Sequence, residues 1–288
     1  MKKTVFLCGA VILFCGALNA MDWPSQDAEL VHNFGWNNRG EPVLGTAFRG
    51  SGFIQAADNG ELLFTRRKGD TASRLPSPLG AWTALDHGDG IISIYSRYDD
   101  SRSYHISDTV SRGTPIAVSG KSGWAAVSGF FFSLFDRRER RWVNPSMIIS
   151  PMEDTQAPVI QSIRLTGERG AGVDLAQVRT LSQGRYTIAV AAADALGNTN
   201  EFSLAPHRII CSFNGTEAGS LLFETVSVRD GVQLMYRNGL TPVKQIYAPF
   251  PRYEVGEVWL TRGQATLEVI AGDIAGNNRS TLYRLQVE

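Results

Sequence analysis

The sequence predicts a mainly β protein of two domains, an antiparallel β-sheet domain followed by a β-sandwich. Three observations lead to this fold class. Short apolar runs alternate with clusters of Gly, Asp and Ser, and no run keeps a helical period for three turns. A segment at 150–158 with two prolines and two acidic residues divides the chain. The length of 288 residues and the hydrophobic content of 43% are sufficient for two packed cores.

The start of the chain has the composition of an export signal. Lys2 and Lys3 supply a basic start, a short apolar run follows, and small residues before Met21 offer a cleavage site. The apolar run is shorter than the ~20 residues needed to span a membrane, and no later stretch is long and apolar enough to do so. We therefore expect a signal peptide at 1–20 and no transmembrane segment after its removal. The expected location is across the inner membrane, periplasmic or associated with the envelope.

Cysteine usage follows from this leader. Cys8 and Cys15 lie within it, so Cys211 is the remaining cysteine of the expected mature chain and cannot form an internal disulfide. Cys211 lies in a strand-like apolar run without a neighbouring His or acid, which is typical of a buried structural thiol. Lipidation of Cys15 stays open, although the bulky Phe14 stands where a lipobox has a small residue.

The charge balance argues against one class of partner. Lys and Arg together number 28, as do Asp and Glu, so the chain is formally neutral. Nucleic-acid binding requires a concentrated basic surface, which this balance does not supply. The arginines at 137–141 are interpreted as a solvated hairpin tip, with binding of an anionic glycan or lipid headgroup as the alternative. We expect no nucleic-acid partner.

The first domain is expected at 22–150, and a linker at 151–156. Residues 86–90 read Asp-His-Gly-Asp-Gly between two apolar runs. This pattern indicates a hairpin, because Asp and Gly readily adopt the positive φ of tight turns. The apolar runs expected to form strands are 53–54, 62–64, 82–85, 91–95, 115–118 and 130–135.

The second domain, expected at 157–288, contains two copies of one pattern. The interval from Gly184 to Asp194 equals that from Gly263 to Asp273 (194 − 184 = 273 − 263). Each copy predicts a half-buried strand, because alternate residues share one face. Each ends in an Asp-x-x-Gly-Asn turn and resembles the strand-and-turn ending of bacterial immunoglobulin-like modules. We interpret the Asp and Asn as turn-forming, with calcium binding as the alternative. The alternating residues are Ile188, Val190, Ala192 and Leu267, Val269, Ala271.

Four sequence blocks follow one another in the first domain, at 56–64, 83–95, 110–123 and 134–145. The first reads Ala-Ala-Asp-Asn-Gly-Glu-Leu-Leu-Phe, the second ends in Ser-Ile-Tyr, and the last contains Leu-Phe-Asp and Val-Asn-Pro. In this order and spacing they resemble the lysostaphin-type M23 metallopeptidases, also called LytM domains. Members of that family cut the peptide cross-links of peptidoglycan with one zinc ion held on an antiparallel sheet. The resemblance implies an M23-like first domain and a role at the cell wall.

The positions that carry chemistry in that family are substituted here. Its zinc ligands come from a His-x-x-x-Asp motif and from one His of a His-x-His pair, and the matching positions are Glu41, Gly45 and Leu134. Its catalytic histidines match Arg97 and Phe132. A catalytic zinc needs three protein ligands and an open position for water. Since Gly45 and Leu134 cannot ligate, we expect no metal, no cofactor and no catalysis, hence a pseudoenzyme.

The remaining histidines do not rebuild the site in sequence. They are His32, His87, His105 and His207, which are scattered over both domains. A lone loop histidine is ordinarily a solvated or capping residue, and a catalytic zinc site needs at least three ligands.

These observations favour a non-catalytic envelope protein that acts as a scaffold or regulator of peptidoglycan remodelling. The resemblance implies activation of a cell-wall hydrolase as one form of this role, because degenerate LytM domains activate peptidoglycan amidases. Two alternatives stay open, a module that binds peptidoglycan directly and an active zinc endopeptidase with unusual ligands. The expected partner is peptidoglycan or a cell-wall hydrolase.

Overall fold

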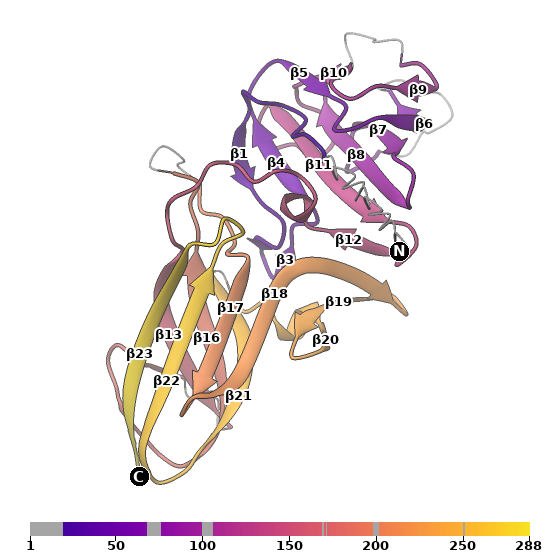
Figure 1. Ribbon diagram of the computed structural model, residues 1–288. Coiled ribbons are helices and arrows are strands. Elements are labelled where there is room, and N and C mark those ends of the chain that lie inside the picture. The colour runs from indigo at the N-terminus through magenta and orange to yellow at the C-terminus, as the bar shows by residue number, and fades with distance from the viewer. Residues whose placement is uncertain are drawn as a thin grey trace, which may run out of the picture.

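The computed structural model describes residues 20–67, 76–99, 106–168, 170, 172–197, 202–249 and 251–288. The predicted signal peptide and His105 lie outside these residues. In the described part the elements are strands and two short 3-10 helices, η1 (Pro145–Met147) and η2 (Val243–Gln245). The mainly β fold class is confirmed (Figure 1). Within the described residues, no helix has the length and hydropathy required to cross a membrane.

The first half of the chain forms an antiparallel sheet. All six apolar runs expected to be strands lie in strands, and the hairpin at 86–90 is confirmed by the bond from the Ile91 amide to the Gly88 carbonyl. Two separate two-stranded sheets accompany this sheet, β5 (Phe53–Gln55) with β10 (Pro115–Val118) and β2 (Asn37–Asn38) with β3 (Glu41–Pro42). The sheet order is β1 (Glu29–His32), β4 (Thr46–Arg49), β11 (Gly129–Asp136), β8 (Ile91–Tyr98), β7 (Ala81–Asp86), β6 (Gly60–Arg66) and β9 (Thr109–Val110).

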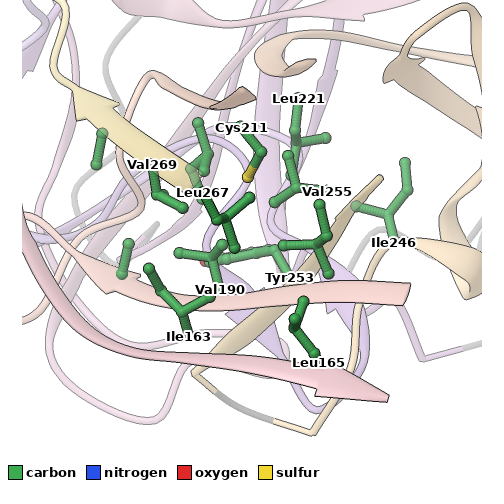
Figure 2. Packing of buried hydrophobic residues seen from close by; sticks show 14 of the residues in the cluster. Ile163, Leu165, Val190, Cys211, Leu221, Ile246, Tyr253, Val255, Leu267 and Val269 are labelled. Carbon is green, nitrogen blue, oxygen red and sulfur yellow. The ribbon is translucent and has the colours of Figure 1, made fainter. Parts of the chain in front are cut away.

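The second half forms two facing sheets. Figure 2 shows Ile163, Leu165 and Val190 of one sheet packed against residues of the other, including Cys211 and Val269. The four-stranded sheet has the order β14 (Gly172–Asp174), β13 (Val159–Gly167), β16 (Gly184–Ala193) and β21 (Arg252–Leu260). The facing strands are β15 (Thr180–Leu181), β23 (Asn278–Val287), β22 (Gly263–Gly272), β17 (Arg208–Phe213) and β18 (Thr216–Arg229).

The two copies of the internal pattern form β16 and β22, one in each sheet of the sandwich. The alternating residues predicted from the sequence are buried in both copies. The burial of β16 is broader than alternation requires, because Ala189 and Ala191 are also buried. Asp194 and Asp273 follow directly after their strands, so each turn begins where its strand ends. Asn198 of the first turn lies outside the described residues.

The two halves share one hydrogen-bonded sheet. Strand β12 (Arg141–Val143) of the first half pairs with β18, which has 14 residues and carries the hairpin β19 (Val232–Arg237) and β20 (Leu240–Pro242). Phe34 packs in the core of the second half, and Leu204 packs in that of the first. Residues 151–156 contain no strand. The domain boundaries at 22–150, 151–156 and 157–288 stay predictions.

Candidate functional site

The sheet around β11, in the first half of the chain, has a core side and a less buried side. Successive side chains of a strand point to opposite faces. Phe130, Phe132 and Leu134 lie in the buried core of the first domain. Phe131 and Phe135, which alternate with them, are half-buried on the other face. We call this less buried side the open face, and its half-buried Phe131 and Phe135 are the β11 side chains that a ligand could contact there.

Phe132 and Leu134, two of the predicted site positions, are both 0% exposed. The ring centroid of Phe132 lies 5.2 Å from that of Tyr95 and 6.5 Å from that of Trp23. Neither side chain can contact a ligand on the open face. Phe132 is a core residue.

Gly45 and Arg97, two further predicted positions, lie on the open face. A Cβ placed on Gly45 would lie 2.8 Å from Cβ of Ser133 and 2.9 Å from Cζ of Phe131. The Arg97 guanidinium lies 4.8 Å from the ring centroid of Phe131. The β11 side chains next to Gly45 and Arg97 are thus Phe131 and Ser133. Each lies one position before the residue predicted from the sequence, Phe132 or Leu134. A one-residue displacement along a strand moves every side chain to the opposite face.

Backbone atoms as well as side chains pack closely around Gly45. Its hypothetical Cβ would lie 2.3 Å from the carbonyl oxygen of Phe132. Real Cβ atoms do not approach backbone this closely, so a larger residue requires β4 and β11 to move apart. An aspartate at position 45 does not fit this packing, and restoring the family's ligand would distort the sheet.

Arg97 has an unusual backbone and environment. Its φ is 65°, a left-handed value that is uncommon for a residue with a side chain. Burial lowers the pKa of its guanidinium below the usual range of arginine. Its Nε atom has no hydrogen-bond partner among the described residues. The guanidinium stays charged at neutral pH and stacks on Phe131, where it can contact an anionic or aromatic ligand group.

Glu41 lies in a different sheet from β11 and β8. It is exposed in β3, which is paired with β2 and contacts η2 of the second half. Its carboxylate belongs to no group of potential metal ligands in the described part of the chain.

His87 belongs to a structural hydrogen-bond chain. Its Nδ1 lies 2.7 Å from the carbonyl oxygen of Asn59, and its Nε2 lies 2.6 Å from Oγ of Ser93. Ser93 Oγ is 3.1 Å from the hydroxyl of Tyr95, which accepts a bond of 2.8 Å from the amide of Ala57. Burial lowers the pKa of His87 and raises that of Tyr95 to about 12. Both ring nitrogens are engaged, so this imidazole is not free to ligate a metal.

The other described histidines are also separate. His32 stacks on Trp36 with ring centroids 3.8 Å apart, and His207 Nε2 lies 3.8 Å from a carboxylate oxygen of Glu224. Over the described residues, the side chains close enough to share a metal are Asp154, Asp194 and Asp273, which include none of the predicted zinc positions.

Aromatic side chains border the open face at two places. Phe64 and Trp82 lie with ring centroids 4.7 Å apart, and Phe135 and Trp142 with centroids 5.1 Å apart. Phe64 is 49% exposed. With Arg97, these residues give the face the composition of a binding surface, because aromatic residues and Arg are enriched in interfaces. We call Phe64, Trp82, Arg97, Phe131 and Phe135 the open-face cluster.

Comparisons with known proteins give remote similarities. A protein-family model matches residues 157–288. No curated protein matches the sequence. Among solved structures, the catalytic domain of a mutant of the prophage-encoded M23 protein EnpA from Enterococcus faecalis is 17% identical, covering 44% of this chain and 95% of that chain with a TM-score of 0.36.

Two further solved structures have similar values. A chain of the SpoIIQ–SpoIIIAH pore forming complex is 15% identical, covering 46% of this chain and 92% of that chain with a TM-score of 0.37. A zinc containing peptidase from Vibrio cholerae is 17% identical, covering 46% of this chain and 41% of that chain with a TM-score of 0.35.

Proposed function

We propose that this chain is a non-catalytic protein of the cell envelope, with a degenerate M23 domain that acts as a scaffold or regulator of peptidoglycan remodelling. The second half is proposed to be an immunoglobulin-like domain, and export by a cleaved signal peptide is part of the proposal. The observation that carries it is the open face beside β11, where Gly45, Phe131 and Ser133 offer no zinc ligand.

The chemistry of hydrolysis supports this proposal. A catalytic zinc lowers the pKa of its bound water from ~15.7 to ~7 and so supplies a nucleophile at neutral pH. On the open face, Gly45 has no side chain, Phe131 is apolar, and Ser133 is a neutral hydroxyl that is 4% exposed. Arg97 is a cation and repels a divalent metal. These groups offer neither a zinc site nor a general base.

The open-face cluster supports a binding role in place of catalysis. Half-exposed aromatic rings beside a guanidinium are typical of the anchors that bind protein partners. The shared sheet through β12 and β18 holds this face in a fixed relation to the sandwich. A cell-wall hydrolase is accordingly our proposed partner, and direct binding of peptidoglycan is the second candidate, since the same cation could contact the carboxylates of its peptides.

The two candidates are separated by measuring binding and activation in parallel. The chain without residues 1–20 is sedimented with purified sacculi, and is also added to a peptidoglycan amidase acting on dye-labelled sacculi. Regulation predicts faster dye release by the amidase and no release by the chain alone. Phe64→Asp should reduce the effect several-fold, whereas Leu282→Asp, on the 54% exposed Leu282 of the sandwich, should not.

Other outcomes of this experiment select the alternatives. Sedimentation with sacculi without any effect on the amidase would support the peptidoglycan-binding module. Dye release by the chain alone, abolished by a chelator, would support an active endopeptidase and overturn the proposal. The absence of both sedimentation with sacculi and any effect on the amidase would also overturn the proposal.

A further inference from the structure

Three aspartates from distant parts of the sequence meet between the two halves of the molecule. Asp154 lies in the segment that connects the halves, Asp194 follows β16, and Asp273 follows β22. One carboxylate oxygen of each lies within 4.8 Å of the other two. Figure 1 shows β22 ending on the side of the sandwich that faces the first domain. The internal repeat thus brings its two turn aspartates together, and the connecting segment adds a third.

This cluster has no basic partner in the described part of the chain. None of its three carboxylates forms an ion pair there. The nearby Arg208 donates to Asn278 at 2.9 Å. His207 is affected by the charge of Asp273, but burial lowers its pKa, so it is neutral at pH 7. Among the described residues, the three like charges are therefore not neutralised by an ion pair.

Asp194 provides a second, independent indication of a missing ligand. The residue is 9% exposed, and its Oδ1 atom is buried with no hydrogen-bond partner among the residues that the structure describes. An unpaired ionised oxygen in such a place is costly, and it requires either a proton or a cation. Burial, together with Asp273 and Asp154, raises the pKa of Asp194 to about 7.

The other two carboxylates are already positioned by hydrogen bonds. Asp273 accepts bonds of 2.8 Å from the amide and from the side chain of Asn277, which confirms the turn-forming role predicted from the sequence. The same Asn277 side chain reaches the Asp154 carbonyl at 3.2 Å, and Asp154 accepts a bond of 2.9 Å from the Gln156 amide. These bonds fix the oxygens in place and leave lone pairs for a cation.

We propose that Asp154, Asp194 and Asp273 bind one calcium ion at the joint between the two halves. The all-oxygen, anionic set selects a hard cation. Calcium holds its oxygen ligands at ~2.3–2.6 Å, so opposite ligands lie up to ~5 Å apart, whereas magnesium at ~2.0–2.1 Å requires them within about 4.2 Å. The oxygen–oxygen separations, all within 4.8 Å, lie inside the span that calcium accommodates. Water or backbone oxygens complete its coordination.

The position of the site gives the ion a structural role. Asp194 pairs through its backbone with Leu204, in bonds of 2.9 and 2.8 Å, and Leu204 lies in the core of the first domain. Asn33 of the first half exchanges two bonds of 2.8 Å with the backbone of Ala205. A calcium ion on Asp194 therefore stabilises the segment that inserts into the first domain. This inference does not depend on the proposed function.

The test is a calcium titration of the chain without residues 1–20, after treatment with a chelator and its removal. We expect saturable binding by calorimetry with a Kd of about 10⁻⁴–10⁻³ M, the range of extracellular modules. Calcium at ten times Kd should raise the melting temperature by about 2–4 °C. Magnesium should give a smaller shift.

Variants decide whether these aspartates form the site. Asp194→Asn should lower the affinity for calcium at least about tenfold. Asp154→Asn should do the same, and it serves as the second variant if Asp194→Asn folds poorly. Asp194→Asn without calcium should melt no lower than wild type, because it removes one of three like charges. Asp230→Asn, in an exposed turn where Asn tolerates the φ of 51°, is the matched control and should bind as wild type does.

Three results would overturn the proposal. The first is the absence of any heat or melting shift at about 10 mM calcium, tenfold above the weakest expected Kd. The second is unchanged calcium binding by Asp194→Asn and Asp154→Asn. The third is an equal or larger response to magnesium, which would reject the assignment to calcium.

Discussion

Replacing Phe132 by Ala tests the assignment of this residue to the core. Its side chain is 0% exposed and packs against Tyr95 and Trp23. Truncation removes the transfer free energy of the ring and leaves a cavity, which together typically cost ~3–5 kcal/mol. Strand pairing holds Phe132 between Thr46 and Tyr95, so β11 cannot collapse far into the space. We therefore expect Phe132→Ala to lower the free energy of unfolding by an amount in the upper part of that range.

The measurement is urea unfolding followed by tryptophan fluorescence, in which Trp23 reports on the contact directly. Phe53→Ala is the matched control, because Phe53 is 52% exposed in the same half of the chain. The free energy of unfolding of that variant should change by only about 0.5 kcal/mol, as is usual for surface changes. Equal unfolding midpoints for the two variants would refute the burial of Phe132 and would place its ring on an open groove.

Three further predictions concern other parts of the molecule. Gly45→Ala should destabilise the chain by about 1–3 kcal/mol through overpacking against β11, whereas Gly167→Ala, whose Cβ meets only the Tyr186 ring at 3.2 Å, should cost less in the same urea assay. Burial lowers the pKa of His87 below 6.5, so the unfolded chain binds the proton more tightly than the folded chain does. The free energy of unfolding should therefore fall as the pH drops below about 6.5. His87→Gln should reduce the change in the urea midpoint between pH 7.5 and pH 5. Cys211 is buried and its thiol pKa is raised, so a thiol reagent should label the chain without residues 1–20 only after denaturation, and labelling of the native protein would contradict this.

The strands were predictable because the hydrophobic alternation of this chain is local. In β16 and β22 the repeated pattern identified the buried face from the residues alone, and the structure confirms it. The hairpin at 86–90 was equally predictable, since its Asp and Gly residues carry the positive φ values of the turn. These features depend on neighbours in sequence, which the sequence displays directly.

The open face of β11 was less predictable. The resemblance in sequence selects Phe132 and Leu134, which lie on the core side. One signal was present in the sequence: the alternation Phe130, Phe132, Leu134 is wholly apolar, whereas the other face includes Ser133. The more polar face of a half-buried strand is the open one.

The joint between the halves could not be derived from the sequence. The pairing of Trp142 with Val226 and the meeting of Asp154 with Asp273 join segments that are distant in the chain. Each segment alone has an ordinary local explanation, a short strand or an Asx turn. Only the tertiary structure shows the uncompensated carboxylates.

The most direct test of the proposed function is zinc content measured together with peptidoglycan hydrolysis. The chain without residues 1–20 is incubated with zinc, freed of unbound metal by gel filtration, and then analysed for metal and for release of peptides from purified peptidoglycan. With Gly45, Arg97, Phe131 and Ser133 on the open face, we predict zinc far below one ion per chain and no released peptides. One zinc ion per chain, lost on chelation together with peptide release, would contradict the account.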